Sequence, residues 1–208
     1  AELLRETNPS PRQQEYIGLI ENAGRTLNTL VNDVLDYAKL EAGKLELEQS
    51  PFDPAALLID CAHMFSLPAS DNGDLVLVDA DADIPAQLRG DAPRLRQVLT
   101  NLLSNAIKFT RHGWIRVGAR CLEERDGRAM IEFTVSDSGI GMTREEQRRL
   151  FQNFSQASAS VAQRFGGTGL GLSISQELVR LMGGDIEVRS APEQGTTFRF
   201  VIPLPVLE

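Results

Sequence analysis

Apolar side chains recur at alternating steps of four and three residues in the first part of the chain, and this pattern limits what it can fold into. A repeat of about 3.5 residues is the seam of a coiled coil or helical bundle, so it predicts one long helix over residues 12–47. A second apolar row widens the face beyond what a two-stranded coil needs, which favours a bundle. The first row consists of Tyr16, Ile20, Ala23, Leu27, Leu30, Val34 and Tyr37, and the second of Val31, Leu35 and Ala38.

The alternative is a single helix that lies on its own domain. Against it stands the stretch "SPFDP" at residues 50–54, where two prolines end the helical pattern and predict a hinge. The turn "ETNPSP" precedes the helix, so the opening "AELLR" is typical of the last turn of an earlier helix. We therefore expect two parts, residues 1–50 from a helical region and residues 51–208 as a separate domain.

Composition excludes several classes of function. The 208 residues are 42% hydrophobic and 24% charged, which is typical of a globular protein. The net charge of −8 disfavours a surface for nucleic acid or anionic membrane, because a phosphate backbone attracts a concentrated basic patch. We see no bilayer-spanning apolar run and no signal peptide. Cys61 and Cys121 lack metal or disulfide spacing, so we expect them in a core in a reducing compartment.

After Pro54 the pattern becomes mixed α/β. Helical spacing and strand alternation occur in turn, with turn residues between them. Asp91 is the predicted N-cap of the middle helix, and Gly183 with Gly184 is predicted to stop the last one. The predicted helices cover residues 55–65, 91–110 and 170–182, and the predicted strands cover residues 74–81, 114–124, 129–137, 185–190 and 196–204.

The middle helix carries polar residues in an unusual place. At about 100° per residue, Asn101, Asn105 and Lys108 fall within about 60° of one another, beside the apolar face of the helix. An amide oxygen is a hard neutral ligand suited to magnesium, which usually keeps substrate phosphates in its shell. A lysine one turn further along supplies a point charge for those phosphates. The alternative is that the three side chains simply face solvent.

The stretch "TVSDSGIGM" places Asp137 at the end of an apolar strand, followed by Gly139 and Gly141. An ionised carboxylate only accepts hydrogen bonds, so on a pocket floor it suits the exocyclic amine of adenine and repels the carbonyl that guanine carries there. The glycines allow the backbone to approach a flat ring closely. A plain turn is the alternative, because Asp and Gly also form turns without any ligand.

Glycines are dense in "RFGGTGLGLSIS", immediately before the last helix. Such a loop can turn backbone amides toward an anion at the positive helix terminus. It is not a Walker A loop, because no Lys-Ser or Lys-Thr pair follows the glycines. Upstream lies "LFQNFSQASASVAQRF", which predicts a lid that brings Arg164 toward a terminal phosphate. A flexible linker and a surface loop without a role are the respective alternatives.

These motifs in this order resemble the ATP-binding half of a bacterial sensor histidine kinase of the hybrid type, over about residues 5–205. "RLRQVLTNLLSNAIKFT" is similar to the asparagine box of that family, "DSGIGM" to its first glycine box, "LFQNF" to its phenylalanine box and "FGGTGLGLSIS" to its second glycine box. "YIGLIENAGRTLNTLVNDVLDYAKLEAGKLELE" resembles the second helix of the dimerisation and histidine-phosphotransfer hairpin.

The resemblance implies an α+β fold, a two-layer α/β sandwich of the histidine kinase, topoisomerase and chaperone ATPase type, preceded by a long bundle-forming helix. It implies ATP and Mg²⁺ as cofactors, with Asn105 as the metal ligand and Asn101 as a catalytic positioning residue. Arg164 would contact phosphate from the lid. The residues implied to bind the nucleotide are Asn101, Asn105, Lys108, Phe109, Asp137, Gly139, Gly141, Phe154, Gly167, Thr168, Gly169, Leu170, Gly171 and Thr197.

The implied reaction moves the terminal phosphoryl group of Mg-ATP to a histidine and then to an aspartate of a receiver domain. The only histidines are His63 and His112, and neither is followed by the acidic residue that the family's acceptor has. We therefore expect the acceptor upstream of residue 1, and no autophosphorylation from this chain alone. The implied partners are ATP, a receiver domain and a second copy through the bundle, in the cytoplasmic portion of an inner-membrane sensor, with neither nucleic acid nor direct membrane contact.

Three departures from the family pattern bear on activity. Gln152 and Asn153 replace an acid and a proline in the phenylalanine box, and Glu193 stands where the last turn usually has a second glycine. Two other functions stay open. One is an ATP hydrolase of the same fold, although Asn101 stands where such enzymes carry a water-activating glutamate. The other is a catalytically weak regulatory module that pairs with another kinase through residues 12–47.

Overall fold

The computed structural model describes residue 4, residue 7, residues 9–151 and residues 169–207. The chain divides into two compact units, residues 1–45 and residues 46–208, so the boundary lies slightly before the one predicted at residue 50. Among the described residues, no helix combines the length and the apolar character that crossing a membrane requires. The predicted earlier helix at residues 1–5 lies almost entirely outside the described residues.

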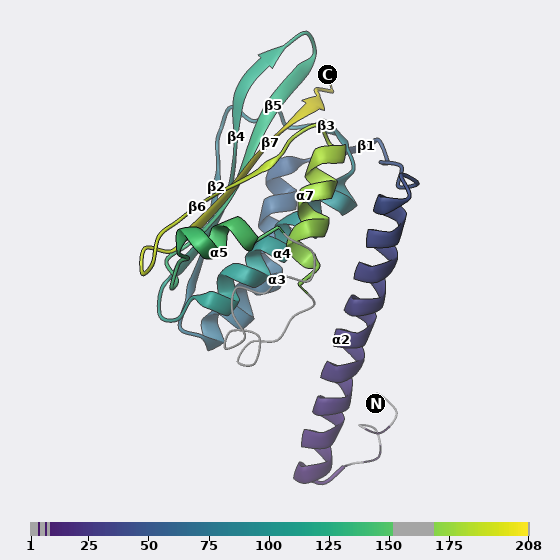
Figure 1. Cartoon of the computed structure of the whole chain (residues 1–208), viewed down its shortest axis with the longest axis vertical. Coiled ribbons are helices and arrows are strands. Elements are labelled where there is room, and N and C mark those ends of the chain that lie inside the picture. Colours follow the sequence, from purple (N-terminus) through teal and green to yellow (C-terminus); the bar gives the residue numbers. More distant parts are fainter. Residues whose placement is uncertain (1–3, 5–6, 8, 152–168, 208) are drawn as a thin grey trace. The chain divides into compact units, whose positions relative to one another are not determined.

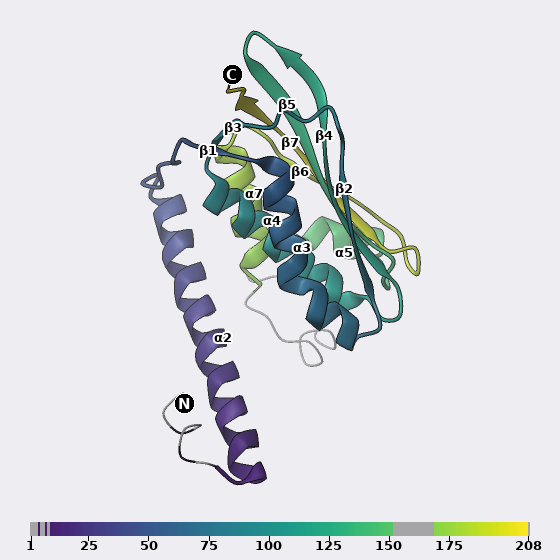
Figure 2. The ribbon, with the colours of Figure 1, turned by 180° about the vertical axis from the view of Figure 1, so that it is seen from behind.

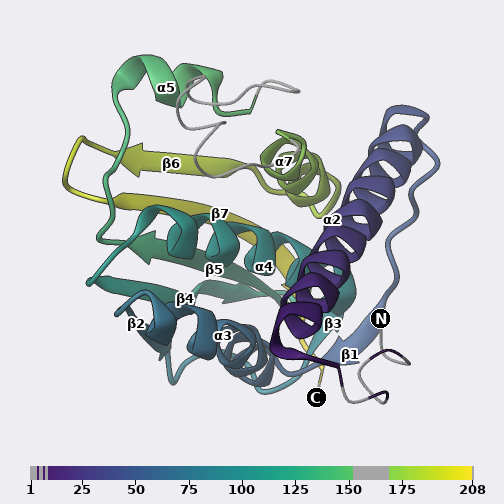
Figure 3. The same cartoon turned by 90° about the horizontal axis from the view of Figure 1, so that it is seen from below.

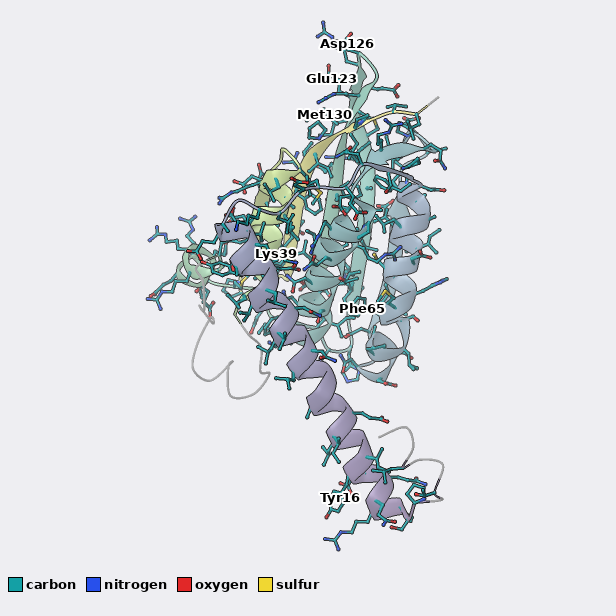
Figure 4. All side chains as sticks on the ribbon, turned by 90° about the vertical axis from the view of Figure 1, so that its right-hand side faces the viewer. Tyr16, Lys39, Phe65, Glu123, Asp126 and Met130 are labelled. Carbon is teal, nitrogen blue, oxygen red and sulfur yellow. The ribbon has the colours of Figure 1, made fainter. Side chains whose placement is uncertain are left out.

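The first unit consists of the predicted long helix, α2 (Pro11–Glu41). Ser10 caps it in a reciprocal capping box with Gln13, which satisfies two of the free amides at the helix start. The helix ends before the predicted residue 47, because Gly43 adopts a left-handed conformation with φ of 62°. The N–H of Gly43 donates to the carbonyl of Leu40 at 3.0 Å, as in other glycine-terminated helices. Figure 4 labels Tyr16 and Lys39 near the two ends of α2.

Apolar side chains on α2 remain exposed within this chain, as the bundle prediction requires. Ile20, Leu27 and Val34 from the first predicted row expose 58%, 61% and 53% of their surface. Val31 and Leu35 from the second row expose 48% and 53%. An exposed apolar face of this kind indicates a surface that packs against another helix or protein.

The second unit is built on a mixed five-stranded sheet with the strand order β2-β4-β5-β7-β6. Only the β2 and β4 pair is parallel, and the other neighbours are antiparallel. All five strands were predicted from alternation. In spatial order they are β2 (Leu75–Ala80), β4 (Trp114–Arg125), β5 (Arg128–Asp137), β7 (Thr196–Pro205) and β6 (Ile186–Ser190).

Three helices, α3 (Pro54–Asp71), α4 (Ala92–Phe109) and α7 (Gly171–Leu181), cover one face of this sheet, as Figure 3 shows from below. Alternate residues of β7 are buried against them. Phe133 of β5 and Phe200 of β7 stack there with ring centroids 5.3 Å apart. The predicted two-layer α/β sandwich is therefore confirmed.

Three short elements were not predicted. β1 (Ser50–Phe52) and β3 (Leu88–Gly90) form a separate two-stranded antiparallel sheet, and α5 (Arg144–Arg149) follows the turn after β5. The hinge predicted at residues 50–54 is wrong, because this stretch forms β1 and the start of α3. Asp53 caps α3 through its carboxylate, and Pro54 occupies the first turn, where a proline costs no hydrogen bond.

The other face of the sheet carries a row of charges that runs across four strands. Glu132 of β5 is 2% exposed, yet its carboxylate pairs with Arg120 of β4 and Arg199 of β7. Arg199 also pairs with Glu187 of β6 at 2.9 Å. Burial acts to raise the pKa of Glu132, but hydrogen bonds from Arg199 and Arg120 outweigh it and the net shift is downward. The β4–β5 hairpin beyond this row carries Glu123 and Asp126, labelled in Figure 4.

Candidate functional site

Asp137 is the last residue of β5, and its side chain points to the helical side of the sheet. It is 7% exposed, and its Oδ1 accepts the N–H of Gly139 at 2.8 Å. Burial raises the pKa of Asp137, although hydrogen bonds from the backbone N–H groups of Gly139 and Thr196 oppose the rise. A buried carboxylate that accepts only backbone hydrogen bonds from Gly139 and Thr196 among the described residues suits a ligand that donates a hydrogen bond.

The turn after Asp137 contacts the end of α4. A Cβ atom added to Gly139 would lie 2.4 Å from the carbonyl oxygen of Phe109 and 2.9 Å from the Asp137 carboxylate. The N–H of Ile140 donates to the same Phe109 carbonyl at 3.3 Å. The structure therefore brings Asp137 beside the last turn of α4, where Lys108 and Phe109 lie. No side chain larger than hydrogen fits at Gly139 without moving one of these groups.

The polar row of α4 lies beside the helix's buried face, as the helical wheel predicted. Asn101, Asn105, Lys108 and Phe109 are half-buried, whereas Ser104 is exposed. Burial lowers the pKa of Lys108, whose ammonium lies 5.1 Å from the centroid of the Phe109 ring. The buried face consists of Leu95, Val98, Leu99, Leu102, Leu103, Ala106 and Ile107.

Asn101 contacts the start of α7. Its Nδ2 donates to the hydroxyl of Ser175 at 2.8 Å, and a Cβ added to Gly171 would lie 2.6 Å from its Oδ1. Ser175 is 2% exposed, and the sequence interpretation did not select it. The available signal was a pair of serines, Ser173 and Ser175, among the apolar residues at the start of α7. Asn101 therefore joins the two helices that carry the predicted site.

The glycine loop leads directly into α7. Gly169 has a φ of 70°, which glycine adopts without strain. Leu170 is 2% exposed and occupies the N-cap position. Within the described part of the chain, no side chain caps this helix, and the first amides of a helix suit an anion. The predicted site residues Phe154, Arg164, Gly167 and Thr168 lie outside the described residues, as do Gln152 and Asn153.

The β6–β7 turn closes over the Asp137 turn. A Cβ added to Gly195 would lie 1.9 Å from the carbonyl oxygen of Asp137, and one added to Gly141 would lie 1.9 Å from that of Ala191. Glu193 lies in the turn between β6 and β7 and has a φ of 60°. Its N–H donates to the carbonyl of Ile140 at 2.7 Å. The glycine that the family usually has at this position would adopt this conformation without strain.

Thr197 lies on the opposite face of the sheet from Asp137. It pairs with Ser136, and its hydroxyl donates to the Ser136 hydroxyl at 3.0 Å. Thr196 is the cross-strand neighbour of Asp137 and is 8% exposed. Because strand side chains alternate between faces, Thr196 and not Thr197 shares the side of Asp137. The sequence interpretation selected Thr197, whereas the register places Thr196 beside Asp137.

The two histidines lie on α3 and just after α4. His63 is on the exposed side of α3, and His112 occupies a turn with a φ of 53°.

Comparison with known proteins agrees with this geometry. The family described as "Histidine kinase-, DNA gyrase B-, and HSP90-like ATPase" matches residues 90–206. The chain belongs to this family. Residues 1–43 match a second family, described as "His Kinase A (phospho-acceptor) domain". The predicted resemblance to sensor histidine kinases is therefore confirmed, for both the ATPase domain and the long helix.

Curated relatives are sensor kinases of much greater length. Sensor protein GacS of Pseudomonas syringae pv. syringae is 45% identical over 204 residues, covering 98% of this chain and 22% of that protein. Signal transduction histidine-protein kinase BarA of Escherichia coli strain K12 is 42% identical over 202 residues, covering 97% of this chain and 22% of that protein. The chain thus spans less than a quarter of these relatives.

A solved structure shares both the fold and part of the sequence. Full-length ShkA, crystallised in complex with AMPPNP, superposes with a TM-score of 0.79 at 33% identity. The match covers 95% of this chain and 40% of ShkA.

Proposed function

We propose that residues 46–208 bind Mg-ATP and donate its terminal phosphoryl group to a histidine on an acceptor helix outside this chain. In the intact protein, the phosphohistidine then passes the group to an aspartate of a receiver domain. The ATPase family and the curated sensor kinases among the relatives support this proposal. The complex of ShkA with AMPPNP, a triphosphate analogue, supports a nucleotide as the ligand.

The observation that carries the proposal is the buried carboxylate of Asp137 against the end of α4. Its Oδ1 is engaged by Gly139 at 2.8 Å, and an adenine amine would supply a further donor. Gly139 lets the turn after Asp137 pack directly against the end of α4, because a Cβ there would collide with the Phe109 carbonyl. We propose that Thr196, rather than the predicted Thr197, supports the base beside Asp137.

The donor set fits a magnesium ion that is shared with the phosphates. The half-buried Asn105 offers a neutral amide oxygen, which suits a hard cation. Among the described residues, no cluster of three or more His, Cys, Asp or Glu side chains could hold a metal, so most ligands would come from phosphate and water. When bound, the ion neutralises charge on the phosphates.

The remaining residues bind and orient the phosphates. The start of α7, which no described side chain caps, presents backbone amides to an anion, and Lys108 adds a positive charge from the last turn of α4. Asn101 has no basic group, and its amide is engaged by Ser175 at 2.8 Å. It cannot activate water as a general base, so the structure favours transfer to another group over steady hydrolysis. Catalysis then rests on positioning and charge neutralisation.

Calorimetry with and without magnesium tests the nucleotide site. We expect submillimolar, magnesium-dependent affinity for ATP in the parent. Asp137→Asn should weaken it about tenfold or more, since a hydrogen bond to a charged group contributes about 1.5–3 kcal/mol. Asn105→Asp should alter the magnesium dependence. Asp126→Asn, at an exposed hairpin tip, is the matched control. Parent-like binding in Asp137→Asn and Asn105→Asp would refute the site.

A transfer assay then separates the kinase from the regulatory module. A separate protein that presents an acceptor helix is mixed with this chain and labelled ATP. Label on the acceptor histidine supports the kinase, whereas ATP binding without transfer supports the module. Rapid release of inorganic phosphate without acceptor would support a hydrolase.

The same proposal extends to the whole protein. The exposed apolar rows of α2 fit a homodimer through a helical bundle, and the match of residues 1–43 to a phospho-acceptor domain supports it. We propose that the intact protein is an inner-membrane sensor with this part in the cytoplasm, on the basis of the curated sensor relatives.

A further inference from the structure

Asp91 lies where the connector from α2 meets the start of α4. It is 6% exposed, and each of its carboxylate oxygens accepts a different backbone N–H. Oδ1 accepts from Arg94 at 2.9 Å, which caps α4. Oδ2 accepts from Glu48 at 3.0 Å, a residue of the connector that precedes β1. One buried carboxylate thus holds two segments that are 43 residues apart in the chain.

The structure beside Asp91 holds the same connector. Ser50, Pro51 and Phe52 of β1 pair with the three residues of β3 that precede Asp91. Gly90 packs so closely that a Cβ there would lie 2.9 Å from the Leu204 side chain. Figure 2 shows β1 and β3 side by side near one end of the helical layer.

The opposite end of α4 is the candidate nucleotide site. The helix runs without interruption from Ala92 to Phe109 and is fixed by a buried apolar face. Asn101, Asn105 and Lys108 lie on this helix, and the Phe109 carbonyl contacts the Asp137 turn. A displacement of the α4 N-terminus therefore moves the phosphate-binding row as a body, because a packed helix shifts rather than bends.

We infer that Asp91 is a positioning residue that fixes the connector after α2 to the nucleotide helix, and so sets where the ATP phosphates stand relative to the acceptor helix. The inference rests on the proposed function. Asp91 acts through α4 and does not itself touch the nucleotide. Only residues 42–47 then separate the end of α2 from the first tethered residue, Glu48.

Chain geometry gives the size of the effect. Without the Glu48 bond, the first anchored residue becomes Ser50 of β1. Two freed residues add up to about 7 Å of reach at 3.3–3.6 Å each. In-line transfer is sensitive to misplacement of about 1 Å, which can cost about a hundredfold in rate. We expect a loss of about tenfold in the transfer rate, because the β1 pairing still limits the motion.

A pair of serine variants separates positioning from helix capping. In Asp91→Ser the hydroxyl still accepts from Arg94, since serine is a good N-cap, but its single oxygen cannot also hold Glu48. Asp53→Ser is the matched control, because Asp53 caps α3 through bonds to Ala55 and Ala56 at 2.8 and 3.0 Å. The two changes are the same, and only one removes a bond to the connector.

Three readouts decide the inference. These are single-turnover transfer from Mg-ATP to a separate acceptor-helix protein, calorimetric affinity for Mg-ATP, and amide hydrogen exchange at Glu48. In Asp91→Ser we expect transfer about tenfold slower than in Asp53→Ser, affinity within about twofold of the parent, and faster exchange at Glu48. Equal transfer in the two variants overturns the inference, and so does a parallel loss of affinity and transfer.

The exchange readout keeps this inference distinct from the proposed function. If the parent binds Mg-ATP but transfers nothing, the proposed kinase function fails. The link between the connector and α4 is then tested by amide hydrogen exchange alone. Greater protection of the Glu48 amide on nucleotide binding, in the parent but not in Asp91→Ser, supports it. An unchanged Glu48 amide overturns it.

Discussion

Replacing Glu132 with glutamine tests the row of charges on the open face of the sheet. The Glu132 side chain is 3% exposed and pairs with both Arg120 and Arg199. Removing one partner of a fully buried ion pair costs about 3–5 kcal/mol. Here the arginine side chains are 58% and 31% exposed, and Arg199 keeps its bond to Glu187. We expect a loss of about 2 kcal/mol, or about 4–8 °C in Tm for a domain of this size.

The pH dependence of this loss has a definite sign. The folded-state pKa of Glu132 lies below its usual value of 4.5, so folding favours the ionised form. The stabilisation is therefore complete above pH 4.5 and is lost as the pH falls through the lower folded-state pKa. Urea unfolding followed by circular dichroism at a series of pH values from pH 7 downward follows this loss. The parent and Glu132→Gln should differ at pH 7 and converge at low pH.

Glu187→Gln is the matched control for this experiment. Glu187 bonds the same arginine, but its side chain is 60% exposed, so its loss should cost less than about 1 kcal/mol. The reasoning is refuted if Glu132→Gln costs no more than Glu187→Gln at pH 7, or if the gap persists at low pH.

Three further outcomes are expected. Glu193→Gly should raise the free energy of unfolding by about 0.5–1 kcal/mol, because a non-glycine residue at positive φ costs about 1–2 kcal/mol and glycine loses part of that gain in the unfolded chain; lower stability in denaturant would contradict this. Without nucleotide, Asp137→Asn should raise Tm at pH 7. Burial raises the folded-state pKa of Asp137, so the parent protein loses stability as the pH rises from 3.8 through the folded-state pKa, and asparagine does not. A lower Tm for Asp137→Asn at pH 7 would contradict this prediction. Asn101→Ala and Ser175→Ala should be non-additive in ATP affinity by about 1 kcal/mol, because the two side chains share one hydrogen bond; additive calorimetric values would show that they act independently.

The long elements of the fold were predictable because each has a clear period. α4 and the central strands carry strong apolar patterns over 10 residues or more. The elements that were missed are short or entirely polar. β1 and β3 have three residues each, too few for alternation to show, and α5 reads "REEQRR" with no apolar face. The end of α2 was placed too late because Leu45 and Leu47 continue the apolar pattern past Gly43.

The placement of the candidate site residues was predictable where a single element fixes it, and not where two elements must be aligned. The row of Asn101, Asn105 and Lys108 follows from helical geometry alone. Choosing Thr196 over Thr197 requires the register of β7 against β5, and a shift of one residue reverses the face. The hydrogen bond between Asp91 and Glu48 links residues 43 apart in the chain, and a local sequence pattern cannot predict such a contact.

The place of β7 in the sheet has a consequence for biosynthesis. This strand pairs with β5 on one side and β6 on the other, yet it is the last of the five strands to be synthesised. Asp137 is translated nearly sixty residues before Thr196, so a nascent chain that ends inside α7 has the carboxylate without its neighbour. Because translation adds about 5–20 residues per second, several seconds pass between the synthesis of Asp137 and that of its cross-strand neighbour. A chaperone that shields the open edge of β5 during that interval would protect the growing polypeptide from aggregation.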